Sequence, residues 1–425
     1  MNLLRFSFVV SLFFLTIESI CQTQPAGNLV IVGGGLEADN KSVYQQLITF
    51  AGGAENAKFA VVPSASGVPM QSYVSFRNIL ISYGLKPENI FLIKVALVDD
   101  DSTSDVNESE WKNGGSDIQQ ASLLSKCSAV WFTGGDQIRT MKTLYLPDGS
   151  QTPVLKAVWD VYRLGGVIGG TSAGAAIMSG VMIGGGTSLA ALKNGMITNY
   201  QGDDFPEDQG VLVTKGLGFF PHGIVDQHFN ARARFGRLTV ALVNNKQQGS
   251  LGFGVDENTA LIYNGKQNKI YVAGAAGVTI FDASGVRISY VQKLPFIENI
   301  AVNYLSEGDS YSFATGIVTP AKGKISTSER EPKNDSYSGQ DGILSPYKKT
   351  LRDLIVKLAE VSLKDPVSDV TGLGPETGFQ ITLRKTKSSE GFYAEKQHYG
   401  DRYTVKNILM DITPVHISAT PIINK

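Results

Sequence analysis

One serine lies in a sequence pattern that suits a catalytic nucleophile. Residues 165–178 begin with glycine and a short apolar run, which predicts a buried strand, and end in small apolar residues, which predict the start of a helix. Between the two lies Gly170-x-Ser172-x-Gly174, the G-x-S-x-G pattern of a nucleophile elbow. Small flanking residues let such a turn close, and a helix N-terminus offers backbone N–H groups to an oxyanion. The alternative interpretation is a structural glycine turn with a serine N-cap.

A serine nucleophile needs a general base and a group that orients this base. The sequence contains four histidines, of which His398 and His416 lie in the C-terminal tail, outside the predicted sheet. His222 follows a proline in a predicted loop, whereas His228 comes just after a short predicted strand and has polar neighbours. We therefore assign the base to His228 and expect His222 to be structural.

The orienting acid should come from the end of another strand. Glu257 follows the apolar run 253–255, and Asp256 is its adjacent rival. Successive residues of a strand point to opposite faces, so only one of the pair should point toward the base. The resulting order of Ser172, His228 and Glu257 differs from that of the α/β-hydrolases, in which the acid precedes the histidine, and this argues against that family.

Three arginines follow the predicted base and indicate what the site binds. Arg232, Arg234 and Arg237 fall on a predicted helix over 232–244, where positions 234 and 237 share a face. Guanidinium groups beside a nucleophile suit a substrate that bears carboxylates. A solvated basic helix face is the alternative.

The first half of the chain alternates apolar runs with helical segments. This alternation predicts an α/β fold with a doubly wound, mostly parallel sheet. In such sheets the site lies beyond the carboxyl ends of the strands, so Gly33–Gly35, Gly134–Gln137 and Ser172 should converge. The predicted strands span residues 28–32, 58–63, 90–95 and 129–133, and the predicted helices span residues 41–51, 70–83, 117–125 and 153–163.

The second half of the chain is predicted to contain more strand. A strand over 252–255 is followed by β-hairpins up to residue 290, with turns at Asn264-Gly265 and at 282–285. The composition becomes polar after about residue 320. We predict a catalytic domain over 25–320, a polar linker over 321–345 and a small α+β C-terminal appendage over 346–425, with no catalytic constellation of its own. In the appendage we expect an amphipathic helix over 346–361 and strands over 378–385 and 403–415.

The N-terminus has the pattern of a secretory signal. A short positive start precedes an apolar run over 6–15, and small residues lie before Gln22, which predicts a signal peptide over 1–21 and a secreted or periplasmic protein. Lipoprotein processing at Cys21 stays open. Cleavage near Cys21 leaves only Cys127, so no intrachain disulfide is expected. The 425 residues carry a formal net charge of −1, which gives no sign of nucleic-acid binding or of attraction to a membrane surface.

Four segments together resemble cyanophycinase over roughly residues 28–290. That family comprises serine peptidases with a class I glutamine-amidotransferase-like fold, related to peptidase E. The segments are Gly169–Ala175, Gly134–Gln137, Asp226–Phe229 with the three arginines, and Gly254–Ala260.

The resemblance implies hydrolysis of cyanophycin, a poly-aspartate with arginine on each β-carboxyl, to β-Asp-Arg dipeptides. It implies that Ser172 is the nucleophile, His228 the base and Glu257 the orienting acid, with no metal and no cofactor. The backbone N–H groups of Gly135 and Ala173 would form the oxyanion hole. The implied substrate-binding residues are Gln137, Asp226, Gln227, Arg232, Arg234 and Arg237.

Two other functions stay open at this point. One is a related serine dipeptidase or isopeptidase that acts on small aspartyl peptides. The other is a secreted, non-catalytic binding homologue. A homodimer also stays open, since members of the family often dimerise.

Overall fold

The structure is a computed structural model that describes residues 27–202, 204–328, 350–360, 367–372, 377–395 and 400–417. The predicted signal peptide and residues 329–345 of the predicted linker lie outside this description. Among the described residues, no helix combines the length and the apolar character that crossing a bilayer requires.

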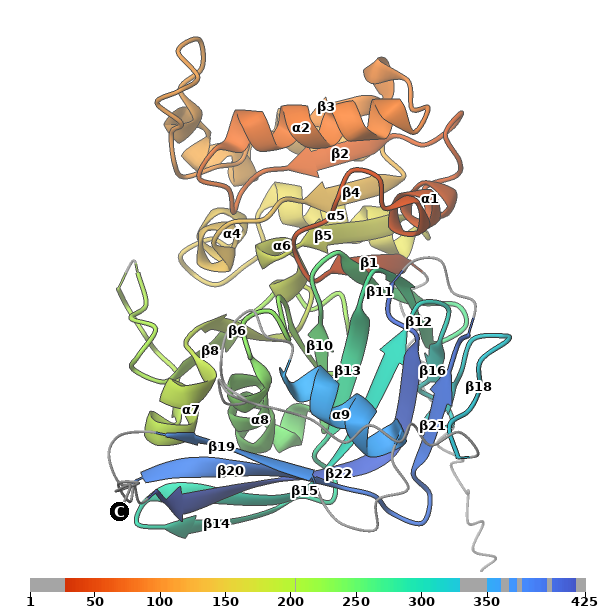
Figure 1. The fold of residues 1–425 in the computed structure, drawn as a ribbon. Helices are drawn as coiled ribbons and strands as arrows, with labels where there is room; N and C mark the ends of the chain where they lie inside the picture. The colour runs from red at the N-terminus through yellow and green to blue at the C-terminus, as the bar shows by residue number, and fades with distance from the viewer. Residues whose placement is uncertain are drawn as a thin grey trace, which may run out of the picture.

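A nine-stranded sheet combines the strands of the first half of the chain with four later strands, of which β12 (Lys269–Gly274) and β16 (Ser310–Ser312) reach toward the second sheet (Figure 1). Five of its strands pair in parallel in the order β1-β5-β4-β2-β3, as the alternation of apolar and helical segments predicts. These strands are β1 (Asn28–Val32), β2 (Phe59–Val62), β3 (Ile90–Leu92), β4 (Ala129–Phe132) and β5 (Val167–Thr171).

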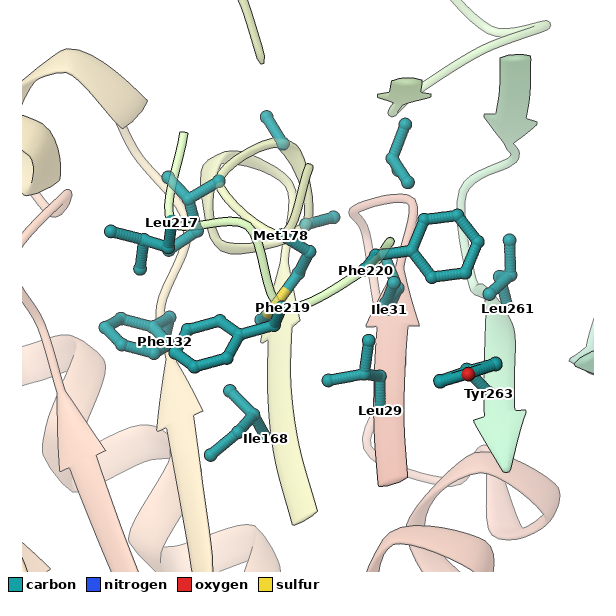
Figure 2. Close-up of a cluster of buried hydrophobic side chains, with 14 of the residues drawn as sticks. Leu29, Ile31, Phe132, Ile168, Met178, Leu217, Phe219, Phe220, Leu261 and Tyr263 are labelled. Carbon is teal, nitrogen blue, oxygen red and sulfur yellow. The ribbon is translucent and has the colours of Figure 1, made fainter. Parts of the chain in front are cut away.

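Helices cover both faces of this parallel region. Leu29 and Ile31 of β1 point into one hydrophobic cluster, and Val30 and Val32 point into another, because successive strand residues face opposite sides. Figure 2 shows Leu29 and Ile31 in the first of these clusters, near Phe220. The helices of this region are α1 (Lys41–Phe50), α2 (Pro69–Ser82), α3 (Ile118–Leu124), α4 (Gln137–Leu144) and α5 (Pro153–Arg163).

Four antiparallel strands extend the same sheet beyond β1. β11 pairs antiparallel with β1, so the sheet is parallel on one side of β1 and antiparallel on the other. The hairpin predicted at Asn264-Gly265 is confirmed, since it joins β11 to β12. The four strands are β11 (Thr259–Asn264), β12 (Lys269–Gly274), β16 (Ser310–Ser312) and β17 (Ile317–Thr319).

A ten-stranded sheet forms the second half of the molecule (Figure 1). Its central order is β22-β15-β13-β10-β9, so strands from the end of the chain continue the sheet that contains β9 and β10. The hairpin predicted at 282–285 is wrong, because β13 and β14 do not pair with each other: each pairs with β15. The strands are β9 (Ile224–Asp226), β10 (Leu251–Val255), β13 (Gly277–Asp282), β14 (Arg287–Val291), β15 (Leu294–Ser306), β18 (Ile325–Ser326), β19 (Val367–Gly372), β20 (Thr377–Arg384), β21 (Glu390–Tyr393) and β22 (Tyr403–His416).

The remaining described elements lie between these sheets and on the second one. A three-stranded sheet is ordered β6-β8-β7. Helix α9 packs its apolar side into the hydrophobic cluster of the second sheet, together with α8. These elements are α6 (Ala173–Ala176), β6 (Val181–Gly185), α7 (Ser188–Asn194), β7 (Met196–Ile197), β8 (Val211–Lys215), α8 (Phe235–Asn244) and α9 (Thr350–Glu360).

Candidate active site

Ser172 lies on the sharp turn between β5 and α6. Its backbone has φ 54° and ψ −111°, a conformation that non-glycine residues rarely adopt. A Cβ added at Gly170 would lie 2.5 Å from the carbonyl oxygen of Gly174, and one added at Gly174 would lie 2.4 Å from that of Phe132. Only glycine fits at either position, which is the physical reason for the G-x-S-x-G spacing.

His228 follows β9 and lies against the glycine turn that ends β1. Its backbone is also left-handed, with φ 48°. Its N–H donates to the carbonyl oxygen of Gly33 at 2.6 Å. A Cβ added at Gly34 would lie 2.2 Å from Cε1 of the imidazole, so the ring occupies the space that a side chain at this position would need.

The three predicted catalytic side chains form one hydrogen-bonded chain. Ser172 Oγ lies 2.8 Å from Nε2 of His228, and Nδ1 of His228 lies 2.6 Å from Oε1 of Glu257. The neighbouring Asp256 is buried and accepts hydrogen bonds from Asn230 instead. The choice between Asp256 and Glu257 is therefore decided geometrically, in favour of Glu257.

His228 is set up to be neutral at pH 7. Burial lowers its pKa below the ordinary value of 6.5, and the positive charges of Arg232 and Arg234 lower the pKa further. The hydrogen bond and the charge of Glu257 oppose this shift without cancelling it. A neutral imidazole whose Nδ1 proton is held by a carboxylate leaves Nε2 free to accept the proton of Ser172.

Two backbone segments flank the Ser172 hydroxyl. Gly134 lies against the serine, since a Cβ added there would be 3.4 Å from Cβ of Ser172. Gly135 has φ +138°, and a Cβ added there would lie 2.0 Å from the carbonyl oxygen of Ala65. Ala173 is the first residue of α6 and follows the serine directly. Of the two residues that the resemblance assigns to the oxyanion hole, Ala173 thus adjoins the serine in the chain, and Gly135 lines the same cleft as Ser172.

A cleft of about 800 Å³ opens from Ser172. Its wall carries charges of both signs, because Arg232 and Arg234 line it together with Asp136, Asp204 and Glu207. The backbone N–H of Arg232 donates to the carbonyl oxygen of His228, at 2.9 Å, whereas its guanidinium has no hydrogen-bond or ion-pair partner among the described residues and is exposed at the cleft. The cleft can therefore bind anionic and cationic groups of one ligand side by side.

Gln137 and Gln227 line the same cleft. Nε2 of Gln137 donates to the carbonyl oxygens of Ile183 and Gly184, at 3.0 and 2.8 Å, which fixes the orientation of the amide. Oε1 of Gln227 lies 3.5 Å from the Ser172 hydroxyl. Both amides thus lie where a bound ligand can reach them.

Asp226 and Arg237 bond to each other in the buried wall of the cleft, which Arg237 also lines. The prediction of a helix that begins at Arg232 is wrong, because α8 begins at Phe235 and the first two arginines lie in the preceding turn. Arg237 therefore points inward, where it donates to both oxygens of Asp226 at 2.8 and 2.6 Å. Arg234 lies 3.7 Å from the same carboxylate, and burial lowers the pKa of Arg234. One carboxylate thus faces two guanidinium groups, so these three side chains together carry an excess of positive charge.

The other histidines lie apart from this chain of hydrogen bonds. His222 stacks on Phe313 with ring centroids 3.5 Å apart, and its Nε2 lies 3.3 Å from the hydroxyl of Tyr263, in accord with the structural role expected for it. His416 ends β22, and His398 lies outside the described residues.

Two asparagines that were not predicted from the sequence, Asn258 and Asn230, lie beside Glu257 and His228. Asn258 has φ 51° and accepts hydrogen bonds from Nδ2 of Asn40 at 2.7 Å and from the backbone N–H of Glu37 at 3.1 Å. Asn230 bonds to Asp256. An asparagine directly after a strand-ending acid is a signal of the left-handed turn seen here, because asparagine tolerates positive φ.

A serine, a histidine and a carboxylate in hydrogen-bonded sequence at the edge of a cleft define a hydrolase of the serine type. Residues 29–271, more than half of the chain, match the model of Peptidase family S51. The chain belongs to this family and is a serine-type peptidase.

Several curated relatives are similar over most of the chain. The cyanophycinase of Geminocystis herdmanii is 32% identical over 293 residues, which cover 68% of this chain and 93% of the relative. The cyanophycinase of Trichormus variabilis is 31% identical over 313 residues, covering 72% of this chain and 92% of the relative. Among solved structures, a peptidase from an acI-B1 Actinobacterium aligns with a TM-score of 0.46 at 19% identity, covering 69% of this chain and 99% of that one.

Proposed function

We propose that this protein hydrolyses cyanophycin and releases β-Asp-Arg dipeptides. The observation that carries the proposal is the hydrogen-bonded chain of Ser172, His228 and Glu257 at a cleft that holds both guanidinium and carboxylate groups. Cyanophycin carries both kinds of charge on every repeat. The curated cyanophycinases, which are 31–32% identical to this chain, support the same substrate.

In this mechanism Ser172 Oγ attacks the carbonyl carbon of an aspartyl backbone amide. Its proton passes to Nε2 of His228, while Glu257 holds the Nδ1 proton and stabilises the imidazolium that forms. The N–H groups of Gly135 and Ala173 stabilise the oxyanion. The proton then passes from His228 to the leaving amine as the C–N bond breaks. Water, activated by His228, hydrolyses the acyl-enzyme and restores the serine.

Substrate recognition follows from the charges of the cleft. Arg232 and Arg234 bind the carboxylate of the polymer terminus, and Gln137 and Gln227 orient the amides. Asp136, Asp204 and Glu207 bind the arginine side chain of the substrate. Asp226 and Arg237 support this surface through their ion pair.

The N-terminal pattern supports export. A chain that loses residues 1–21 in the secretory pathway would act on polymer outside its own cytoplasm. The predicted division into a catalytic domain over 25–320 and a C-terminal part after the linker is part of the same proposal.

The test is to incubate purified protein lacking residues 1–21, and its Ser172→Ala variant, with insoluble cyanophycin and to analyse the supernatant by mass spectrometry. Release of β-Asp-Arg by the wild type alone supports both the substrate and the nucleophile. Cleavage of small aspartyl dipeptides without polymer turnover favours the dipeptidase alternative. Binding of polymer without release, and without labelling of Ser172 by a fluorophosphonate, favours the non-catalytic homologue.

A further inference from the structure

The loop that carries His228 is bonded to a helix from the end of the chain. Asn230 lies two residues after His228 and is only 5% exposed. Its side-chain oxygen accepts a hydrogen bond from the backbone N–H of Arg352, at 3.2 Å. Arg352 lies in the first turn of α9, where backbone N–H groups have no partner within the helix. Asn230 therefore caps α9 from another part of the chain.

The nitrogen of the same amide binds Asp256, the residue next to Glu257. Nδ2 of Asn230 donates to both carboxylate oxygens of Asp256, at 2.9 and 3.0 Å, and the backbone N–H of Asn230 donates to Oδ1 at 2.9 Å. Glu257 follows Asp256 directly. One amide thus ties together the base loop, the acid strand and α9.

Glu257 depends on its neighbours for its position. Its side chain is 41% exposed and, in the described part of the chain, makes a hydrogen bond to His228 alone. Asp256 on one side is held by Asn230, and Asn258 on the other side is held by Asn40. A carboxylate without other restraints keeps its direction only if the backbone beneath it is fixed.

Helix α9 is itself firmly anchored. The guanidinium of Arg352 donates to both oxygens of Asp401, at 2.6 and 2.9 Å, and the hydroxyl of the buried Tyr304 donates to the same carboxylate at 2.9 Å. Leu354 of α9 is fully buried in the hydrophobic cluster that also contains Phe229, the residue after His228. The helix is therefore a rigid support and not a loosely attached end.

We propose that α9 forms part of the catalytic apparatus, with Asn230 as the positioning residue that transmits its support to His228 and Glu257. The inference rests on the proposed roles of these two residues. It assigns the C-terminal segment a task in catalysis, separate from substrate binding.

The experiment measures how fast Ser172 reacts with a fluorophosphonate between pH 5 and 9. In this reaction Oγ bonds to phosphorus, fluoride leaves and the serine proton passes to His228, so the rate reports the base and its orientation without any peptide substrate. We expect Asn230→Ala to lower the second-order rate constant about tenfold, because small displacements of reacting groups have effects of this size or larger. Its pH midpoint should shift as well.

An exchange of donor and acceptor provides the decisive control. Asn230→Asp and Asp256→Asn should each be slow, because each breaks the amide–carboxylate pair. The double variant N230D/D256N restores one donor and one acceptor, and it should recover the wild-type rate to within about threefold. Arg384→Ala breaks an ion pair with Asp411 on β22, elsewhere in the C-terminal strands, and should leave the rate and its pH profile unchanged.

Several outcomes would overturn the inference. One is that Asn230→Ala reacts with the fluorophosphonate at the wild-type rate at every pH. Another is that the double variant N230D/D256N regains the wild-type melting temperature but still reacts slowly. If Asn230→Ala does not fold, the rates of Asn230→Asp, Asp256→Asn and the double variant test the same contact between residues 230 and 256. Failure of the wild type to react at Ser172 overturns the proposed function together with the inference, whereas equal rates in wild type and Asn230→Ala overturn the inference alone.

Discussion

The carboxylate of Asp226 and the guanidinium of Arg237 form a two-point ion pair in which both side chains are at most 2% exposed. Burial removes water from both charges, so each depends on the other for its stability. The pair lies directly under the loop that continues into Gln227 and His228. The pair therefore stabilises the segment from which the site is built, and the free energy of unfolding of a variant that lacks the pair tests this role.

Replacing Asp226 by Asn should lower the free energy of unfolding by about 3–5 kcal/mol, because Arg237 would keep a buried charge without its carboxylate. Urea denaturation measures this change. Asp160→Asn is the matched control: its pair with Arg163 is exposed, so the same substitution there should cost less than about 1 kcal/mol. Equal losses in both variants would contradict the role given to Asp226.

Glu257→Gln should lower kcat for dipeptide release by about 10²- to 10⁴-fold, with little change in folding stability. The amide cannot stabilise the imidazolium, and it allows His228 to take the wrong tautomer. Steady-state assays measure the loss. Glu298→Gln, at an exposed pair with Arg287, should keep wild-type kcat. A Glu257→Gln variant with wild-type kcat would exclude this residue as the orienting acid.

The pH profile of kcat/KM should rise with pH and have its midpoint below 6.5, because protonated His228 cannot accept the serine proton and its pKa is lowered. Removing the positive charge of Arg232 by substitution with Ala should raise this pKa. The acid limb of the profile should then move to higher pH, and KM should increase. Arg287→Ala, with an exposed arginine on β14, is the control. An unchanged acid limb in Arg232→Ala would show that Arg232 does not influence the base.

Gly34→Ala should lower kcat/KM by about 10²-fold or more, since the added Cβ would lie 2.2 Å from the imidazole of His228 and displace it. Gly53→Ala is the control, because it introduces backbone strain without a collision. Gly53 also has positive φ, +83°, but a Cβ added there has nothing within 4 Å. Both variants should lose some stability, and only Gly34→Ala should lose activity. Comparable activity in the two variants would mean that His228 tolerates the displacement.

Folding stability should fall as the pH drops from about 6.5 toward 4, partly through His222. Burial lowers the pKa of this histidine to about 4, so the unfolded chain binds more protons than the native protein in this interval. His222→Phe keeps a ring beside Phe313 without a titrating group, and its unfolding free energy should depend less on pH. Urea midpoints at pH 7 and pH 5 give the comparison. The same pH dependence in both proteins would exclude His222 as a source of the effect.

Much of the parallel sheet could be predicted because its strands are short apolar runs that end in small residues. The strand at 28–32 and the helix at 153–163 agree with β1 and α5 residue for residue. The hairpin of β11 and β12 was predicted, but its antiparallel pairing with β1 was not, since pairing partners far apart in sequence leave no local pattern. The course of β13 was missed for the same reason: it pairs not with β14, the next strand, but with the second half of β15, whose first half pairs with β14.

The meeting of the three predicted site residues could be derived only in part, because Ser172 follows β5 of the first sheet whereas His228 and Glu257 follow β9 and β10 of the second. Ser172, His228 and Glu257 each follow a strand, and the structure brings them together. The directions of Asp226 and Arg237 could not be inferred, because the helix begins three residues later than its pattern indicates. The residue at which a helix begins sets the direction of each of its side chains, and so decides whether a charged group points to solvent or forms a buried pair.

The pairing of β22 with β15 also has a consequence in time. β22 lies between β15 on one side and β20 and β21 on the other, so it is an internal strand of the sheet and not an edge strand. The ribosome releases residues 403–416 after every other described strand, and until then the edge of β15 that receives them has no partner. Until these residues are inserted, the open edge of β15 can pair with a strand of another chain, so the step at which β22 joins the sheet is where misassembly during synthesis is expected.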